Sequence, residues 1–377
     1  MPHHSRILGL GLLMLIACGV FGFPLANSQP QKSPAPPFDR SAMLAHLAYD
    51  VMLPTYLNFE TAAVALQDAT AQLCEAPTLA RLEAAQARWR QAALHWKRSE
   101  AFQLNLTQLY AKSIGFWPTR ERRLRQALMS DEPITPAYVE NMGVAAQGLS
   151  TMEYLLFDAE AGQTAVLQAM QEGPMAKRWC PYLATMSAHL AEKAHAVARL
   201  WRPKGTDFSG TVAHAGQGGT IYPTSHRVIS DIVNQLVSAV ETVLNSKIGK
   251  PLRGNGRQPW PNAVEAGRSG SSKALLIATL EGAFAVYSGE VESQSGPGFD
   301  DFLTSLGSDL GARITEQFHT ALTAAHAIPE PLRVAIVEQP QAVQAAYEAM
   351  QPLLILLKVD MTNVLSVTVD FSDNDGD

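Results

Sequence analysis

Charged and polar side chains lie in or beside apolar, helix-forming stretches of this 377-residue chain. A charge in such a setting must be paired, ligated or neutralised, because its unpaired burial is costly. Either one ligand-binding cleft or a set of structural arginine–carboxylate pairs would meet that requirement. The candidate residues are Arg98, Glu100, Ser150, Glu153, Glu265, Arg268, Ser269 and Asp360.

The stretch 144–158 reads as a helix that carries two of these residues. Ser150 and Glu153 are three residues apart, so they share a helix face and can act on one ligand. Gly148 costs such a helix about 1 kcal/mol relative to alanine, which indicates a close approach to the backbone, by a ligand or by a crossing helix. A different, apolar face is predicted from the i, i+3, i+7 spacing of Leu149, Met152 and Leu156.

Carboxylates together with a serine hydroxyl suit a hard ion such as Ca²⁺, Mg²⁺ or iron(III) better than Zn²⁺. We expect Glu153 and Glu100 to be the metal ligands. The triplet His189-x-x-Glu192-x-x-His195 is a separate candidate, spread over about 120° of one helix, and its alternative is a solvated helix face. The zinc-peptidase helix motif needs histidines at i and i+4, and the chain has no such pair.

Residues 148–157 resemble the signature region of imelysin-like proteins, a bacterial envelope family with a Gly-x-His-x-x-Glu motif. Gly148 and Glu153 match the motif, and Ser150 stands at the position of its histidine. The resemblance extends from about residue 41 to the end of the chain. It includes residues 96–100, Trp117-Pro118, Pro251-Leu252, Glu265, Arg268-Ser269, Asp360 and the Asp-Gly-Asp ending.

The resemblance implies an all-α fold of two packed helical bundles, and it links some members to iron uptake and others to metallopeptidase activity. Because a serine hydroxyl is a poorer transition-metal ligand than imidazole, we expect a non-catalytic protein that binds a metal ion or metal complex in an iron-uptake setting. The alternatives are a metallopeptidase of the imelysin type and a structural or partner-binding helical lipoprotein. The implied cofactor is iron or calcium, and the implied partners are iron-uptake components.

Composition agrees with a helical, globular protein. Hydrophobic residues make up 47% of the chain and charged residues 17%, which is typical of an ordered domain. The net charge of −6, without a basic stripe, argues against general nucleic-acid binding. Leu82, Trp89 and Trp96 recur at i, i+7 and i+14, and this spacing predicts the buried stripe of a bundle helix.

The first residues predict export. Residues 1–17 read as a signal peptide, because the apolar run 7–17 is too short to span a bilayer. Leu15-Ile16-Ala17-Cys18 looks like a lipobox, which would lipidate Cys18 and anchor the protein to an envelope membrane. Ordinary cleavage after Ser28 is the alternative. Residues 18–40 form a proline-rich tether.

Composition shifts divide the remaining chain into three parts. Residues 41–203 are predicted to form an N-terminal helical bundle, the glycine-rich residues 204–224 a flexible loop, and residues 225–377 a C-terminal bundle. Cys74 and Cys180 remain as the other two cysteines. In an oxidising compartment they predict a disulfide, and two buried thiols are the alternative.

Overall fold

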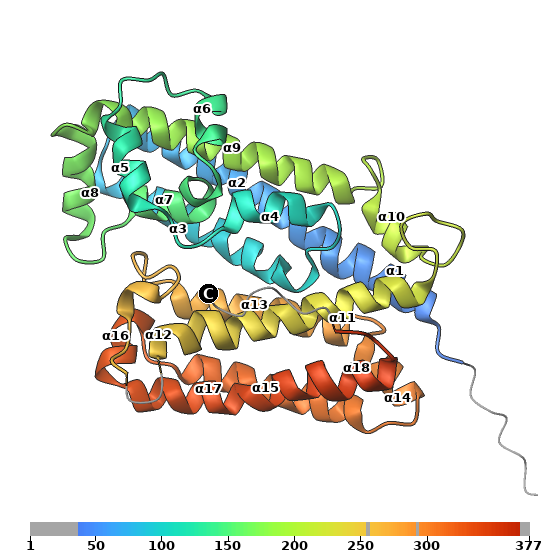
Figure 1. Ribbon diagram of the computed structural model, residues 1–377. Coiled ribbons are helices and arrows are strands. Elements are labelled where there is room, and N and C mark those ends of the chain that lie inside the picture. Colours follow the sequence, from blue (N-terminus) through green and yellow to red (C-terminus); the bar gives the residue numbers. More distant parts are fainter. Residues whose placement is uncertain (1–36, 254–256, 292–293, 370–377) are drawn as a thin grey trace, which may run out of the picture. The chain divides into compact units, whose positions relative to one another are not determined.

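Helices make up nearly all the regular structure in the computed structural model, which describes residues 37–253, 257–291 and 294–369 (Figure 1). The prediction of an all-α fold is confirmed for these residues. The chain divides into the units Met1–Pro37 and Phe38–Asp377, and the second contains nearly all the described residues. The signal peptide, most of the tether and the lipidation site Cys18 lie outside the described part. Among the described helices, none has the length and apolarity that a membrane span requires.

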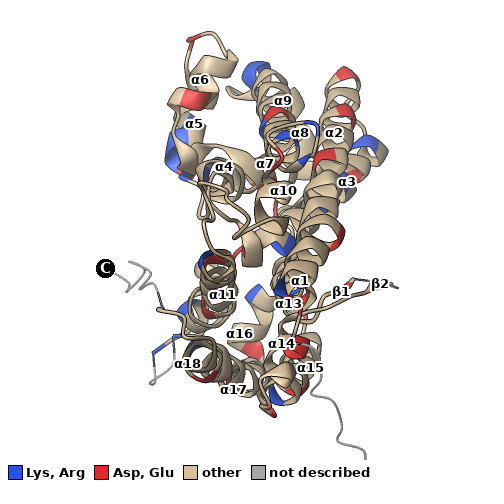
Figure 2. Cartoon of the chain, turned by 90° about the vertical axis from the view of Figure 1, so that its right-hand side faces the viewer, with Lys and Arg blue, Asp and Glu red and all other residues tan. Residues whose placement is uncertain are grey.

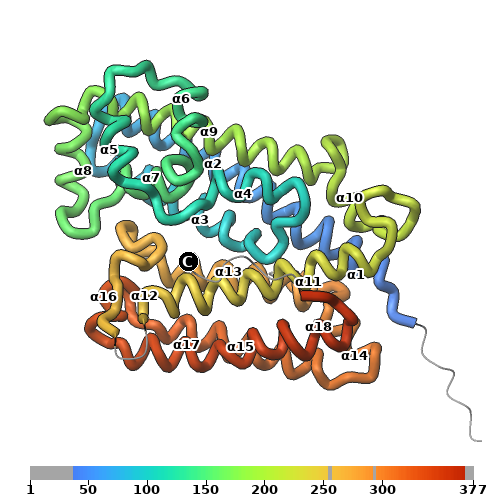
Figure 3. Tube along the Cα trace, in the orientation of Figure 1, coloured from blue at the N-terminus to red at the C-terminus, as the bar shows by residue number. Residues whose placement is uncertain are grey.

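The first group of helices is built on three long ones. Helix α2 (Leu53–Glu75) packs against both α3 (Leu79–Arg98) and α9 (Ala176–Trp201). Shorter elements cover them, as the tube in Figure 3 shows. These are α1 (Arg40–His46), η1 (Leu47–Met52), η2 (Ser99–Phe102), α4 (Thr107–Gly115), α5 (Glu121–Met129), α6 (Pro136–Asn141), η3 (Val144–Ala146), α7 (Gly148–Leu156), α8 (Gly162–Gln171) and α10 (Phe208–Ala213).

Helix α3 shows why these residues form a bundle. Its N-cap is Thr78, whose side chain accepts a hydrogen bond from the Arg81 amide at 3.4 Å. The predicted stripe is buried: Leu82, Trp89 and Trp96 are at most 2% exposed. The Trp96 ring packs against Phe59 of α2 with centroids 4.9 Å apart. The stripe is therefore the contact between α3 and the core.

A disulfide joins the two helices that flank this core. Cys74, near the end of α2, is bonded to Cys180, near the start of α9, with their Cα atoms 5.5 Å apart. The two residues are separated by 106 positions in the chain. In the chain-entropy model, closing a loop of that length stabilises the folded protein by about 4–5 kcal/mol.

The second group of helices is built on α11 (Ser225–Glu241), α13 (Ser272–Ser288), α15 (Leu310–Ala327) and α17 (Pro340–Ile355). Helix α13 packs against α11 and α15, and α15 packs against α17. The other elements are η4 (Thr242–Gly249), α12 (Lys250–Leu252), η5 (Pro261–Ala263), β1 (Glu290–Val291), β2 (Gln294–Ser295), α14 (Phe299–Ser305), α16 (Leu332–Glu338), η6 (Leu356–Met361) and α18 (Thr362–Leu365). Strands β1 and β2 pair antiparallel, with Glu290 opposite Ser295.

The two groups meet along α3 and α13. Helix α13 packs against α3, and both α11 and α13 pack against η2 (Figures 1 and 3). One continuous cluster of buried apolar side chains extends through both groups. The described residues therefore share one core. Acidic and basic residues are distributed over both groups (Figure 2). The division into separate domains at 41–203 and 225–377 stays a prediction.

The stretch 204–224 differs from the predicted flexible loop, because it contains helix α10. The Asp207 side chain accepts a hydrogen bond from the Gly210 amide at 3.0 Å and caps this helix. Phe208 is 1% exposed and its ring lies edge-on to Trp201, with centroids 5.0 Å apart. Tyr222 of the same stretch is also 1% exposed, and its ring lies 6.1 Å from that of Phe208, so two aromatic residues fix the stretch to the core.

Candidate functional site

Helix α7 begins at Gly148 and is fixed against α3 and the end of α4. Gly148 has φ +69°, and a Cβ atom there would lie 2.3 Å from the Ile114 carbonyl oxygen. The Trp89 indole donates a hydrogen bond to the Leu149 carbonyl at 2.8 Å. The Gln86 amide donates to the Leu156 carbonyl at 2.7 Å. The close approach indicated by Gly148 is therefore made by the backbone of α4.

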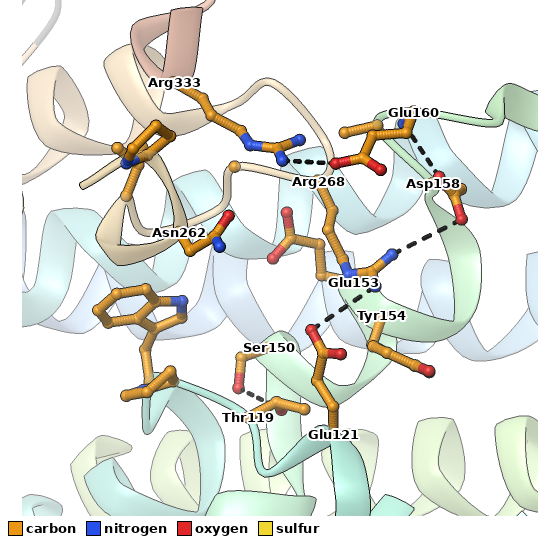
Figure 4. Close-up of a pocket in the computed structure, with 16 residues that line it drawn as sticks. Thr119, Glu121, Ser150, Glu153, Tyr154, Asp158, Glu160, Asn262, Arg268 and Arg333 are labelled. Carbon is orange, nitrogen blue, oxygen red and sulfur yellow. Dashed lines mark hydrogen bonds and ion pairs between the residues drawn. The ribbon is translucent and has the colours of Figure 1, made fainter. Parts of the chain in front are cut away.

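A cavity of about 350 Å³, which we call the large cavity, lies beside α7, and both groups of helices contribute to its wall (Figure 4). Ser150 and Glu153 both face it, as their spacing on one helix predicts. Its lining is mixed in charge and includes aromatic rings. The lining residues are Trp117, Pro118, Thr119, Glu121, Ser150, Glu153, Tyr154, Asp158, Ala159, Glu160, Pro261, Asn262, Val264, Gly267, Arg268 and Arg333.

Glu153 is the most buried charged residue of the cavity wall, at 5% exposure. Its Oε1 accepts a hydrogen bond from the Ser269 amide at 2.8 Å. Burial raises the pKa of Glu153 to about 7, although the Ser269 hydrogen bond and the charge of Arg268 act in the opposite direction. No salt bridge to Glu153 is present among the described residues. At neutral pH this carboxyl group is therefore partly protonated and partly ionised.

Ser150 belongs to a network of hydroxyl groups. Its Oγ donates a hydrogen bond to the Phe116 carbonyl at 2.6 Å and lies 3.1 Å from the Thr119 hydroxyl. Thr119 also contacts the Thr151 hydroxyl at 2.9 Å. The single hydroxyl hydrogen of Ser150 is thus committed to the backbone, and its lone pairs face a second hydroxyl group.

Arg268 is held on the cavity wall from several sides. Its guanidinium lies 4.4 Å from the centre of the Tyr154 ring and donates to the Phe157 carbonyl at 3.3 Å. It also lies 3.6 Å from a Glu121 oxygen and 3.9 Å from an Asp158 oxygen. Figure 4 shows Arg268 between these two carboxylates. The backbone amides of residues 160 and 161 donate to Asp158 and, as the largest cause, lower its pKa, so it is ionised at neutral pH.

Glu100 lies in a buried ionic quartet instead of the cavity wall. We define the quartet as Lys97, Glu100, Lys247 and Glu265. Lys97 Nζ is 2.5 Å from Glu100 and 2.6 Å from Glu265, while Lys247 Nζ is 2.6 Å from Glu100 and 3.6 Å from Glu265. The Thr279 hydroxyl completes the coordination of Lys247 at 2.8 Å.

The quartet is neutral as a whole, and its charges stabilise one another. Burial alone would raise the pKa of Glu100, but Lys247 and Lys97 lower it to about 2. Burial alone would lower the pKa of Lys97, but Glu100 and Glu265 raise it above its ordinary value. Glu100 and Lys97 are therefore charged at neutral pH. The alternative to a cleft that the sequence left open was a set of arginine–carboxylate pairs, whereas this structural pairing is made by lysines.

A cavity of about 20 Å³, the inner cavity, adjoins the larger one. Trp117, Ser150 and Glu153 line both, so they form the wall between them. Lys97 and Glu265 of the quartet also line the inner cavity. Its volume is enough for about one water molecule. The inner cavity therefore brings the quartet close to Glu153, and the charge of Glu265 adds to the raised pKa of Glu153.

The eight candidate residues lie in four places. Ser150, Glu153 and Arg268 line the large cavity, and Ser269 contributes its backbone amide. Glu100 and Glu265 belong to the quartet. The remaining two, Arg98 and Asp360, lie elsewhere.

Arg98 and Asp360 form ion pairs outside the cavity. Arg98 pairs with Glu281 at 3.0 Å, and both side chains are 40% exposed. Asp360 lies 3.6 Å from Arg313, in a separate groove between α15 and η6. The structure does not bring Asp360 to the cleft in which we expected it.

The described residues do not provide a site for a bare metal ion. No group of three or more histidine, cysteine or acidic side chains converges in this part of the chain. Glu100 is paired with two lysines, and no cluster of acidic side chains forms around Glu153 among the described residues. A hard ion such as Ca²⁺ takes roughly six to eight oxygen ligands, often from several carboxylates. The arrangement around these two glutamates does not supply such a set.

The histidine triplet on α9 does not form a ligand set either. His189 is buried at 5% exposure, so it does not lie on a solvated face. His195 is exposed, and its Nδ1 lies 2.7 Å from Glu60 of α2. Glu192 between them is exposed. The three side chains face different surroundings.

Several residues of the site could not be found from the sequence. Lys97 pairs with Glu100 at the i, i+3 spacing of a helix, and that spacing was a usable signal. Lys247 and Arg333 approach their partners from distant segments, and nothing in their neighbouring residues marks them. The other lining acids that we did not predict are Glu121, Asp158 and Glu160.

The chain matches known proteins over most of its length. The family model described as imelysin (peptidase M75) matches residues 52–358. Iron-regulated protein A of Synechococcus elongatus is 26% identical over 319 residues, which cover 80% of this chain and 82% of that protein.

Two solved structures share the fold, each at 19% sequence identity. The structure described as an iron-regulated protein A precursor from Parabacteroides distasonis has a TM-score of 0.76, and the match covers 89% of this chain and 96% of that one. An imelysin-like protein from Psychrobacter arcticum has a TM-score of 0.67, with 88% and 97% covered. At this identity the likeness concerns the fold alone.

Proposed function

The chain belongs to the imelysin family, and we propose that it is a non-catalytic binding protein of the bacterial envelope that acts in iron acquisition. Its ligand occupies the large cavity beside α7. The observation that carries this proposal is the cavity of about 350 Å³ with the buried carboxyl group of Glu153 in its wall. Cavities of this size with a few converging polar groups bind small molecules.

The ligand that this cavity suits is a metal complex, not a bare metal ion. A bare ion would find no cluster of three or more acidic, histidine or cysteine side chains among the described residues of the wall. A complex brings its own chelating atoms, so the protein needs to recognise only its outer surface. In this proposal, no side chain of the protein coordinates the metal directly.

The iron setting and the envelope location rest on relatives and on the N-terminal sequence. The relative from Synechococcus elongatus carries the name iron-regulated protein A. A lipobox at Cys18 would hold the mature protein at a membrane, whereas cleavage after Ser28 would release it. Labelling with a radioactive fatty acid distinguishes the two, because a Cys18→Ala change abolishes labelling only if Cys18 is acylated.

A metallopeptidase is the second candidate, because the matching family model is described as a peptidase family. Ser150 at the position of the motif histidine removes the side chain best suited to a transition metal. Hydrolysis of an unfolded protein by the purified chain would favour this candidate. The hydrolysis would have to be abolished both by chelators and by Glu153→Gln.

Two alanines on the same loop give a matched test of the binding proposal. Ala159 lines the cavity and is exposed, so Ala159→Trp fills the cavity without disturbing the core. Ala161 is also exposed but does not line the cavity, so Ala161→Trp is the control. The full chain would be incubated with iron(III) complexes of citrate and of desferrioxamine B. Iron retained after gel filtration would then be measured by elemental analysis.

We expect one of these complexes to be retained at a stoichiometry near one. Ala159→Trp should weaken its binding by about tenfold or more, which is the effect of losing one good contact, and Ala161→Trp should leave it unchanged. Equal binding by both variants would place the ligand elsewhere. Failure of both complexes to bind the unaltered chain would favour the structural, partner-binding alternative.

A further inference from the structure

The large cavity contains more acidic than basic side chains. Its acidic residues are Glu121, Glu153, Asp158 and Glu160, and its basic residues are Arg268 and Arg333. The quartet behind the inner cavity adds no net charge, because it holds two lysines and two glutamates. The field inside the cavity is therefore negative, and it concentrates cations.

Both arginines of the cavity already have carboxylate partners. Arg268 lies between Glu121 and Asp158, and its flat face is covered by the Tyr154 ring. Arg333 donates a hydrogen bond to Glu160 at 2.8 Å. Among the described lining residues, no guanidinium is left for an incoming anion. An anionic ligand would have to displace a carboxylate and enter a negative field.

Glu153 is the acidic residue of the cavity wall that forms no ion pair with either of these arginines. Arg125, which is outside the cavity wall, also lies 3.7 Å from Glu121, but even with Arg125 counted the acids exceed the arginines by one. The Ser269 amide donates to Oε1 of Glu153, and no described side chain neutralises its charge. Figure 4 shows its carboxyl group in the middle of the labelled side chains, between Asn262 and Arg268.

We propose that the group which enters the cavity is an organic cation, namely an ammonium group that approaches Glu153. This inference rests on the proposed function and names the class of its ligand. An ammonium group supplies the counter-ion that Glu153 lacks, and it donates hydrogen bonds to an acceptor-only carboxylate. The Trp117 side chain lines the same cavity and offers an aromatic surface that attracts cations.

The ammonium group has two possible sources, which share the same chemistry. It is borne by a metal chelate with an amine-bearing arm or by an iron-free amine. Binding by titration calorimetry of the full chain, near pH 8, distinguishes them with two matched pairs of probes. The first pair is cadaverine and glutarate, which have the same carbon chain length and opposite charge. The second is the iron(III) complex of desferrioxamine B, with its terminal ammonium, and the N-acetylated complex without it.

We expect the cationic member of at least one pair to bind about tenfold or more tightly than its counterpart. A preference within the first pair assigns an iron-free amine, and a preference only within the second assigns a chelate. Glu153→Gln should remove most of the preference, because glutamine keeps the shape of the side chain without its charge. Glu281→Gln, at the exposed pair with Arg98, should leave it unchanged.

Two results would overturn the inference. If glutarate binds as tightly as cadaverine and the neutral complex binds as tightly as the cationic one, at a site that Ala159→Trp blocks, the inference is overturned and the proposed function still stands. Absence of binding by every probe would also overturn it. If iron(III) citrate then still binds in the cavity, only the ligand class is wrong, and if it does not, the proposed function fails as well.

Discussion

Glu153 combines burial with a missing counter-ion, and this combination has a cost in stability. Burial raises the pKa of its carboxyl group to about 7, so the folded protein binds this proton more tightly than the unfolded chain does. The contribution of this group to the free energy of unfolding is therefore fully present below about pH 4.5, the ordinary pKa of glutamate. This contribution is lost as the pH rises through about 7. The proposed binding role would give this carboxyl group a function that offsets its cost.

We predict that Glu153→Gln is more stable than the unaltered protein at pH 8. Glutamine stays neutral at every pH, and its amide oxygen can accept the Ser269 hydrogen bond that Glu153 accepts now. The difference in unfolding free energy should grow in favour of the variant by about 3 kcal/mol between pH 4.5 and pH 8. Urea denaturation at a series of pH values measures it.

The control for this prediction is Glu281→Gln at the exposed pair with Arg98. Its difference from the unaltered protein should stay within about 1 kcal/mol, as for other exposed ion pairs. A Glu153→Gln difference that is independent of pH would contradict the raised pKa, because it would mean that this carboxyl group has the same pKa in the folded and the unfolded chain.

At the scale of elements, helix α7 depends on the close approach of α4. Gly148→Ala would place a Cβ atom 2.3 Å from the Ile114 carbonyl oxygen and 2.5 Å from that of Ser113. It would also force alanine to adopt φ +69°. We expect a loss of about 3 kcal/mol in unfolding free energy, from backbone strain and overpacking together.

Gly162 offers a matched comparison for Gly148. It has φ +74° at the start of α8, but a Cβ atom there would meet nothing within 4 Å. Gly162→Ala should therefore cost only the conformational strain, about 1–2 kcal/mol. Denaturation curves of the two variants test the difference. Equal losses would show that the contact with α4 contributes nothing.

The elements that the sequence predicts well are those with local, periodic signals. The stripe of Leu82, Trp89 and Trp96 needs only helical spacing, and so does the shared face of Ser150 and Glu153. Helix α10 was missed because its buried side chains, such as Phe208 and Val212, are few and lie in a glycine-rich stretch. Local periodicity carries no information about such isolated contacts.

The site was only partly predictable for a related reason. Glu100 and Glu153 look alike in sequence, since each is a carboxylate next to an apolar helix face. What separates them is the approach of Lys247, which is 147 residues from Glu100 in the chain. A pairing over that distance depends on how the two groups of helices pack, which no spacing within one helix reveals.

At the scale of the whole molecule, the quartet joins the two groups of helices. Lys97 and Glu100 belong to α3 and η2, whereas Lys247 and Glu265 come from η4 and the segment before α13. Lys97→Met would leave two buried carboxylates with one lysine. We expect it to lower the unfolding free energy by about 3–5 kcal/mol, the usual cost of breaking a buried ion pair.

The neighbouring Arg98 provides the control for Lys97. Arg98→Met breaks an exposed ion pair with Glu281 of α13 and should cost less than about 1 kcal/mol. Both variants would be compared by urea denaturation at neutral pH. Adding Glu265→Gln to Lys97→Met should recover part of the loss, because it removes an unpaired charge. A similar, small cost for both lysine and arginine variants would contradict a structural role for the quartet.

The large cavity takes its wall from residues 117–160 of one group and 261–333 of the other. An occupant touches both, so its binding energy is added to the resistance of the entire unit to unfolding. Ligand-bound molecules should then survive longer than ligand-free ones in the presence of chaperones and proteases. The abundance of the protein in the cell would thus follow the supply of its ligand.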